Sequence, residues 1–319
     1  MIDRIRTGVI GVGNFGSKHA EKYSTLPSSR LIAVADIDEA RARQSAERFG
    51  ACPVTDFRDL VGKVDAVSIA VPTAQHYDVA RFCLENGIHA LVEKPISDRA
   101  EHGYALSELA DRNSLVLQVG HIERFSPTFE ALQEIVERPM YIESNRISVF
   151  TGRSTDVNVI LDLMIHDIEL VMALVESPVE SVDAVGAAIV SEHEDIANTR
   201  VLFENGCVAN ITASRISHKI ERSMRIFQPH EYTVADLHTR KLFRFIERED
   251  DKSGEPLRVD RMEQPIEEWD SLEREIDSFL TAVASGTAPK VTGRHASDVV
   301  RVASMIEESL RAHREKAGF

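Results

Sequence analysis

Short, uninterrupted apolar runs alternate with amphipathic stretches over the first 120 residues. Runs that are apolar at every position are typical of strands buried on both faces, and strands that alternate with helices indicate a parallel sheet. Strands are predicted at 7–10, 31–35, 65–71, 88–92 and 115–119, and helices at 17–24, 39–48, 74–85 and 97–112. The pattern predicts an α/β domain over residues 1–123, a Rossmann-type doubly wound parallel sheet.

The pattern changes at Ser126-Pro127, which suits the N-cap and first position of a helix with an apolar face. Strands without intervening helices then predict a large, mainly antiparallel sheet. They are expected at 141–150, 182–190, 197–203, 207–214, 223–227, 231–237 and 242–246. Residues 124–319 are therefore predicted to form an α+β domain for substrate binding and oligomer formation. Of its last two helices, 271–285 and 295–316, the second is able to pack back on the first domain.

A G-x-G-x-x-G motif lies between the first predicted strand and helix, formed by Gly11, Gly13, Asn14, Phe15 and Gly16 with Val12. In this setting the glycines permit a tight turn, the approach of a pyrophosphate to the backbone, and close packing of the helix. The next strand ends in Asp36, where an acid can accept hydrogen bonds from the adenosine ribose; the alternative for Asp36 is a helix N-cap. We predict a dinucleotide site and expect NAD rather than NADP, because a carboxylate repels a 2′-phosphate.

Further cofactor contacts are predicted after the next strands, at Pro72, Thr73, His76, Glu93 and Lys94. His76 either borders the nicotinamide or is an ordinary surface histidine. Lys94 stands at the carboxyl end of a strand, where open α/β sheets bind ligands, and a lysine there can stabilise an alkoxide or hold a proton. The alternative is a surface lysine. Arg41 and Arg43, on the helix after Asp36, are expected to face solvent.

The segment 157–170 is apolar on nearly every side, which predicts a buried helix. Asp162 and His166 are four residues apart on one face of it, and Asn158 lies one turn earlier. Polar groups on a buried helix usually line a cavity, although a structural Asp–His pair is the alternative. We expect a reaction centre between the two domains, with His166 as general base, Asp162 as its orienting group and Lys94 on the alkoxide. Whether Lys94 or His166 finally holds the proton stays open.

Composition narrows the class of protein. The net charge of −15 argues against nucleic-acid binding, and no apolar run is long enough to span a membrane. An early strand at the N-terminus leaves no room for a signal peptide. Cys52, Cys83 and Cys207 lack metal-ligand spacing and are expected to be reduced core residues of a cytoplasmic protein, with no metal site.

Several segments together resemble the Gfo/Idh/MocA (glucose–fructose oxidoreductase / inositol dehydrogenase) family, and the similarity extends over nearly the whole chain. They are Gly11 to Gly16, Glu93-Lys94-Pro95, Arg124-Phe125-Ser126-Pro127, Asp162 with His166, and Pro289 to Gly293. The resemblance implies a nicotinamide-dependent oxidoreductase of CH–OH groups, in which Lys94 contacts the reacting hydroxyl and Asp162 and His166 complete the site. The chain departs from the family at Val157-Asn158-Val159 and Met164, where members usually carry glycines.

Residues 119–125 and 162–167 resemble the branch of the family that contains nucleotide-sugar 3-dehydrogenases, such as those acting on UDP-N-acetylglucosamine. We therefore expect a sugar or nucleotide-sugar substrate, oxidised at carbon 3. Candidate substrate contacts are His121, Arg124, Arg153 and Asn158, and the two arginines suit a diphosphate unless they only pair with nearby acids. The alternatives are a reductase with the same fold and a catalytically silent NAD-binding regulator. The predicted strands of the second domain form more sheet surface than one helix can cover, which predicts a homodimer or homotetramer.

Overall fold

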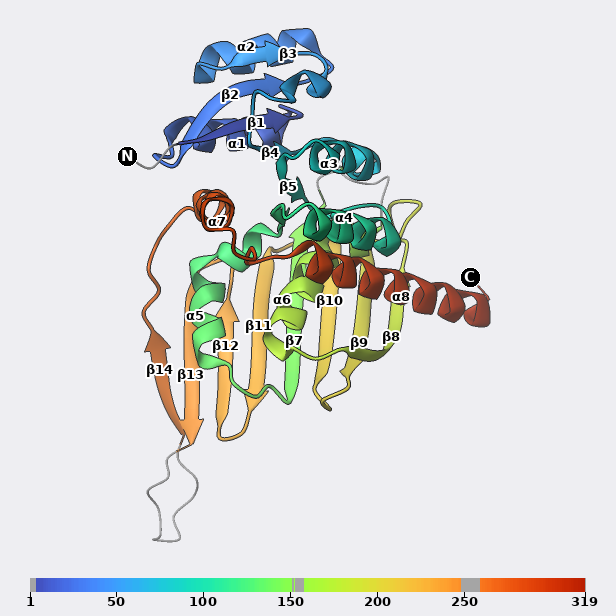
Figure 1. The fold of residues 1–319 in the computed structure, drawn as a ribbon. Helices are drawn as coiled ribbons and strands as arrows, with labels where there is room; N and C mark the ends of the chain where they lie inside the picture. The colour runs from blue at the N-terminus through green and yellow to red at the C-terminus, as the bar shows by residue number, and fades with distance from the viewer. Residues whose placement is uncertain (1–3, 151, 153–157, 248–258, 319) are drawn as a thin grey trace, which may run out of the picture. The chain divides into compact units, whose positions relative to one another are not determined.

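The computed structural model describes residues 4–150, 152, 158–247 and 259–318 (Figure 1). The chain divides into two compact units, one formed by residues 1–125 with 270–301 and the other by residues 126–269 with 302–319. Within the described residues, no helix combines the length and the apolar character needed to cross a membrane.

The first unit contains a parallel sheet with strand order β3-β2-β1-β4-β5-β6. Its strands are β1 (Ile5–Ile10), β2 (Ser29–Ala35), β3 (Cys52–Val54), β4 (Ala66–Ile69), β5 (His89–Glu93) and β6 (Leu117–Gly120). Ile10 pairs with Ala35 of β2 and with Ile69 of β4, so these strands end at one edge of the sheet. The predicted doubly wound sheet is confirmed. Strand β3 was not predicted, because three residues that include a proline give no apolar run.

Helices cover both faces of this sheet. They are α1 (Asn14–Thr25), α2 (Glu39–Phe49), α3 (His76–Glu85), α4 (Ala100–Arg112), α7 (Ser271–Ser285) and the beginning of α8 (Gly293–Ala317), with 3₁₀ turns η1 (Phe57–Leu60), η2 (Thr73–Gln75) and η3 (Ile122–Phe125). Tyr23 of α1 and Phe279 of α7 share one apolar cluster with Val9 of β1. Leu84 and Leu106, from α3 and α4, belong to the cluster on the other face. This packing explains why residues 270–301 belong with the first unit rather than with the second domain to which we assigned them.

The second unit contains an eight-stranded sheet with strand order β14-β13-β12-β11-β7-β10-β9-β8. Its strands are β7 (Tyr141–Val149), β8 (Val179–Ala187), β9 (Ile196–Phe203), β10 (Val208–Ser217), β11 (Glu221–Gln228), β12 (Glu231–Asp236), β13 (Lys241–Glu247) and β14 (Val259–Gln264). Only the β7–β10 pair within the described sheet is parallel, so the predicted mainly antiparallel sheet is confirmed. Strand β14 was not predicted, because its polar sequence lacks an apolar run.

One face of this sheet is covered by α5 (Pro127–Ile135), α6 (Ile165–Val175) and the last part of α8 (Figure 1). Inward and outward positions alternate along β7, where Ile142, Ser144 and Arg146 are buried and their neighbours are partly exposed. All three cysteines are free. Cys83 and Cys207 are buried as expected, whereas Cys52 is exposed on β3, so its assignment to the core was wrong.

Candidate active site

The turn after β1 needs glycine at two positions for steric reasons. Gly11 has φ +83°, and a Cβ there would lie 2.7 Å from the carbonyl oxygen of Ala70. A Cβ on Gly16 would lie 1.8 Å from the carbonyl oxygen of Gly11. Gly13, the N-cap of α1, has open space at its Cβ position. This open side beside a helix N-terminus fits the close approach of a pyrophosphate.

The Asp36 carboxylate is buried and tied to the main chain around the glycine turn. It accepts hydrogen bonds from Val12 N and from Asp38 N, both at 3.0 Å. The alternative reading of Asp36 as a helix N-cap is wrong, because Asp38 occupies the N-cap of α2. A carboxylate fixed at the end of β2, facing the glycine turn, is suited to accept hydrogen bonds from ribose hydroxyls.

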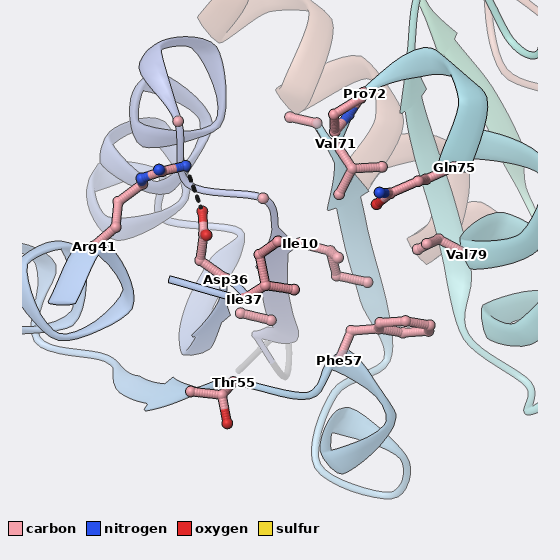
Figure 2. A pocket seen from close by; sticks show the side chains of 14 residues that line it. Ile10, Asp36, Ile37, Arg41, Thr55, Phe57, Val71, Pro72, Gln75 and Val79 are labelled. Carbon is pink, nitrogen blue, oxygen red and sulfur yellow. Dashed lines mark hydrogen bonds and ion pairs between the residues drawn. The ribbon is translucent and has the colours of Figure 1, made fainter. Parts of the chain in front are cut away.

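A pocket with a cavity volume of about 420 Å³ lies beside these residues (Figure 2). This volume is within the range of small-molecule sites. The pocket is lined by Ile10, Gly11, Gly13, Ala35, Asp36, Ile37, Arg41, Thr55, Phe57, Ala70, Val71, Pro72, Gln75 and Val79. Ile37 is 91% exposed, so a flat apolar group such as adenine could cover it without displacing other contacts.

Arg41 and Arg43 have different surroundings, although both were expected to face solvent. Arg43 pairs with Glu39 on the exposed side of α2. Arg41 lines the pocket, and its guanidinium lies 3.4 Å from Asp36 Oδ2 and 3.3 Å from Asp38 Oδ2. Arg41 is exposed as expected, with half of its side chain accessible to solvent, and it lines the pocket in addition.

His76 is buried between two main-chain carbonyl groups. Its Nδ1 lies 2.7 Å from the oxygen of Pro95, and its Nε2 lies 2.9 Å from the oxygen of Val71. Burial lowers the pKa of His76, although both carbonyl groups act in the opposite direction. The surface-histidine alternative was wrong: the ring connects the segments that follow β4 and β5. Pro72 lines the pocket directly, whereas Thr73 begins η2 without lining it.

Lys94 directly follows β5 and is partly exposed. The preceding Glu93 turns its carboxylate into the first unit, where Oε1 lies 2.9 Å from Nε2 of the buried His19. The other ring nitrogen of His19 lies 2.9 Å from Ser68 Oγ, which in turn bonds to Tyr23. Burial raises the pKa of Tyr23 far above its ordinary value. This buried polar chain fixes the position of Glu93, directly next to Lys94.

Glu275, which is fully buried, brings a second carboxylate close to this chain. One ligand atom from each of His19, Glu93 and Glu275 lies within 4.8 Å of the other two. These are ligand types that a divalent metal accepts. His19 and Glu93 already bond to each other, however, so the expectation that the protein has no metal site stays a prediction.

His121 and Arg124 follow β6, at the same sheet edge as Lys94, since β5 and β6 are parallel. His121 is 1% exposed and Arg124 is 9% exposed. The main-chain N–H of Arg124 donates to the carbonyl of His121 at 3.0 Å, within a tight segment that continues into η3. Both candidate side chains therefore belong largely to the interior of the first unit.

Asp162 and His166 are held by a local irregularity in the second unit. Asp162 lies in a π-helical turn, η4 (Ile160–Met164), and His166 lies in the first turn of α6. Both are partly exposed, whereas Ile160, Met164, Ile165 and Ile168 around them are buried. Single π-turns occur frequently at functional sites. The buried helix is confirmed, and the π-turn within it was not predicted.

Side chains of the second unit anchor this helix at both ends. Asn158 Oδ1 accepts from Leu161 N at 3.1 Å, and its amide nitrogen donates to Glu307 of α8. After His166, Asp167 is buried with Arg146 Nε at 2.5 Å and accepts from Ser144 at 2.7 Å. Asn158 thus has a structural role in addition to the substrate contact that we predict. Arg153 lies outside the described residues.

Several of these supporting residues were missed from sequence. On α1, His19 lies one turn after Gly16 and one turn before Tyr23, so all three residues are on the face toward the sheet. This spacing could have predicted from the sequence that His19 is buried. Ser144 and Arg146 occupy inward positions of β7, which the alternation along that strand indicates. No local signal predicts that Arg146 pairs with Asp167, because the pair joins separate elements.

A parallel sheet with a glycine turn, a buried acid at the end of β2 and an adjoining pocket defines the first unit as a dinucleotide-binding domain. The comparisons give the family. The family model described as "Oxidoreductase family, NAD-binding Rossmann fold" matches residues 5–121, and the family model of the GFO/IDH/MocA C-terminal domain matches residues 139–229. The chain belongs to the Gfo/Idh/MocA family of oxidoreductases, and its first unit binds NAD. The predicted family and cofactor are confirmed.

UDP-N-acetylglucosamine 3-dehydrogenase from Acidithiobacillus ferrooxidans is 37% identical over 283 residues, which cover 88% of this chain and 89% of the relative. Its solved structure superposes with a TM-score of 0.90 over 97% of this chain and 98% of that one. An inositol 2-dehydrogenase from Rubrobacter xylanophilus is 34% identical over 196 residues, 56% of this chain and 55% of the relative. Levoglucosan dehydrogenase in complex with NADH and levoglucosan, 20% identical, shares the fold with a TM-score of 0.82 over 97% of this chain and 98% of that one.

Proposed function

We propose that this oxidoreductase transfers a hydride from a secondary ring hydroxyl of a nucleotide-linked N-acetylhexosamine to NAD, with carbon 3 of UDP-N-acetylglucosamine as the expected position. The observation that carries the proposal is the extent of the similarity to the dehydrogenase of that name, which covers 88% of this chain and so goes well beyond the nucleotide-binding unit. The Asp162 and His166 pair supports it, because these are partly exposed polar side chains on a mostly buried, apolar helix.

Three side chains carry the proton chemistry in this proposal. The alcohol loses its C–H hydride to the bound nicotinamide, which supplies the redox chemistry, and it loses its O–H proton to the protein. His166 takes that proton, Asp162 orients the imidazole, and Lys94 stabilises the developing alkoxide. Lys94→Arg tests this assignment against a lysine base, because arginine keeps the positive charge but does not give up a proton at neutral pH.

The nucleotide diphosphate is assigned to Arg124 and Arg153, with His121 and Asn158 as further contacts. A chain with a net charge of −15 needs local cations to hold a diphosphate. Arg124 is largely buried, which limits its reach, so we expect Arg153 to make the larger contribution. Arg153→Ala should raise the KM for the UDP-sugar more than it lowers kcat.

The decisive experiment is NAD reduction with a panel of UDP-hexoses, UDP-N-acetylhexosamines and the corresponding free sugars. We expect turnover of a UDP-N-acetylhexosamine and poor turnover of free N-acetylglucosamine, which lacks the remote binding energy of the nucleotide. Equal activity on the free sugar, or none on any UDP-hexosamine, would contradict the substrate. If the protein bound NAD but oxidised none of these alcohols and reduced none of the corresponding ketones, the result would indicate a catalytically silent NAD-binding regulator.

One face of the eight-stranded sheet has no helix of the described residues packed on it, and this face supports a homo-oligomer. A row of aromatic rings crosses four adjacent strands there, formed by Tyr141, Phe227, Tyr232 and Phe245 with successive centroid distances of 5.6, 4.7 and 5.2 Å. Tyr141 lies between inward positions of β7, so period-two alternation places the row on the face opposite α6. We therefore propose a homodimer or homotetramer formed through this face.

Sedimentation velocity at micromolar concentration tests the proposed assembly. The wild type should sediment as a dimer or tetramer, and Phe227→Asp should dissociate it, because a carboxylate in the middle of an apolar interface is costly to bury. Arg43→Asp, an exposed change on α2, is the matched control. A monomeric wild type would refute the assembly. The cytoplasmic location expected from cysteine usage stays a prediction.

A further inference from the structure

Asn158 begins the helical segment that carries Asp162 and His166, and it holds the first turn in two ways. Its side-chain Oδ1 accepts a hydrogen bond from Leu161 N at 3.1 Å, the bond that an N-cap residue makes to the third residue of a helix. Its main-chain carbonyl accepts a hydrogen bond from Asp162 N at 3.2 Å. The main chain of Asp162, within the π-turn η4, is therefore bonded directly to Asn158.

Glu307 of α8 fixes which way the Asn158 amide faces. The amide nitrogen of Asn158 donates to Glu307 Oε1 at 2.5 Å. An amide group can turn either its oxygen or its nitrogen toward a neighbour, but a carboxylate only accepts hydrogen bonds. The amide nitrogen must therefore face Glu307, which leaves the amide oxygen to face Leu161 N. Without the carboxylate, the amide loses the constraint that keeps the cap in place.

Helix α8 supports the same segment a second time, two turns further along. Arg314 Nη1 lies 2.8 Å from Glu194 Oε1, and the main-chain carbonyl of Glu194 accepts from Val159 N at 3.0 Å. Glu307 and Arg314 are seven residues apart, so they share one face of the helix. Leu310, which lies between them on that face, is 2% exposed. One face of α8 thus holds the start of the helical segment through two polar contacts.

We infer that Glu307 is a positioning residue for Asp162 and acts through the Asn158 amide. The inference rests on the proposed function, in which Asp162 orients the imidazole of His166. A catalytic group that is misplaced by about 1 Å can cost about a hundredfold in rate. Because Glu307 acts on the geometry of Asp162, its loss should lower kcat more than it raises KM.

The first test is a double-mutant cycle, with kcat measured on the sugar or UDP-sugar that the wild type oxidises best. Glu307→Ala should lower kcat about tenfold to a hundredfold. Glu307→Gln, whose carbonyl oxygen still accepts from Asn158, should stay within about threefold of the wild type. In an Asp162→Asn background, Glu307→Ala should lower kcat by less than about twofold more, because residues that act as a unit are not additive. Equal losses in both backgrounds, or near-normal kcat in Glu307→Ala, would overturn the inference.

Glu308→Ala is the matched control, because it removes the same charge from the next, exposed position of α8 and should leave kcat unchanged. Hydrogen exchange over residues 159–166, followed by mass spectrometry, separates the inference from the proposed function. Glu307→Ala should exchange at least about tenfold faster there than the wild type, Glu307→Gln or Glu308→Ala. A wild type that oxidises no alcohol would contradict the proposed function and leave this measurement valid. Unchanged exchange in Glu307→Ala would overturn the inference.

Discussion

The two units organise their candidate functional residues by different means. In the first unit, Asp36 and His76 are held by the main chain: Asp36 accepts from two N–H groups, and His76 lies between two carbonyl oxygens, whereas Glu93 is held by the side chain of His19. The glycine turn has the same character, because Gly11 and Gly16 are required by nearby carbonyl oxygens. Here the fold itself provides most of the contacts that fix the site.

In the second unit, side chains hold other side chains. Asp167, which follows His166, is fixed by Arg146 and Ser144 of β7, and Asn158 bonds to Glu307 of α8. Each of these bonds joins elements far apart in sequence. A site built from the main chain should tolerate substitution of its supporting side chains, whereas a site built from paired side chains should depend strongly on each partner.

The largest expected effect is therefore loss of the Arg146–Asp167 pair. Both side chains are almost fully buried, at 4% and 1% exposure, so Arg146→Ala leaves an uncompensated carboxylate in the core. Breaking such a pair typically costs about 3–5 kcal/mol. We expect faster hydrogen exchange in β7 and α6 and a lower urea midpoint for the second unit.

Two variants sharpen this comparison. Arg43→Ala removes an exposed i,i+4 partner in the first unit and should cost no more than about 0.5 kcal/mol. Arg146→Met/Asp167→Leu removes both buried charges and should recover much of the stability lost in Arg146→Ala. A cost below about 1 kcal/mol for Arg146→Ala would show that the second unit does not depend on this pair.

The next effect concerns catalysis and compares one proposed residue from each unit. Lys94→Ala should lower kcat about a hundredfold to a thousandfold, which is the usual cost of losing one contact to a developing oxyanion. His166→Ala should lower kcat similarly and flatten the pH–rate profile near neutrality. Both variants should still bind NAD, because the glycine turn and Asp36 are intact. Near-normal turnover of either variant would place the chemistry elsewhere.

The contrast between the units also explains how much the sequence could predict. The glycine turn and Asp36 were predicted because their spacing has a direct backbone meaning. The strand pattern predicted both sheets, except for β3 and β14, which lack apolar runs. In both cases the information is local in the chain.

The remaining parts of the site depend on partners that are distant in sequence. Asp162 and His166 are predicted as site residues because they interrupt an apolar helix, but the π-turn that carries Asp162 has no sequence signature. The pairing of His19 with Glu93 joins residues 74 positions apart, so spacing could not predict it. Arg41 is exposed as expected, but helix geometry alone does not show that its side chain reaches Asp36 and Asp38.

A smaller effect separates two roles of glycine within the first unit. Gly16→Ala places a Cβ 1.8 Å from the Gly11 carbonyl oxygen, and forced overpacking typically costs about 1–3 kcal/mol. Gly13→Ala meets open space, so it should leave the melting temperature unchanged and instead weaken NAD binding by obstructing the pyrophosphate. Differential scanning fluorimetry and NAD titration distinguish the two. Equal thermal stability of both variants would contradict the steric argument for Gly16.

The smallest expected effect concerns pH, and it arises from the buried imidazole of His76. Burial lowers its pKa in the folded protein relative to the ordinary value near 6.5 that applies to the unfolded chain. The unfolded state therefore binds the proton more readily, so the contribution of His76 to stability is complete above about pH 6.5 and is lost as the pH falls below that value. The Val71 and Pro95 carbonyls that His76 connects adjoin the pocket and Lys94, so the same loss should loosen that edge of the sheet.

The measurement is the free energy of unfolding from urea titrations between about pH 5.5 and pH 7.5. His76→Gln keeps an amide that can donate to one carbonyl but cannot be protonated in this range, so its stability should fall less than that of the wild type as the pH is lowered. Burial also lowers the pKa of His89, although the charge of Asp65 acts in the opposite direction. His89→Gln should therefore also reduce the loss of unfolding free energy as the pH is lowered. If His76→Gln lost stability as steeply as the wild type, the carbonyl-bound imidazole would not be a source of acid sensitivity, and the main-chain contacts of the first unit would be independent of pH.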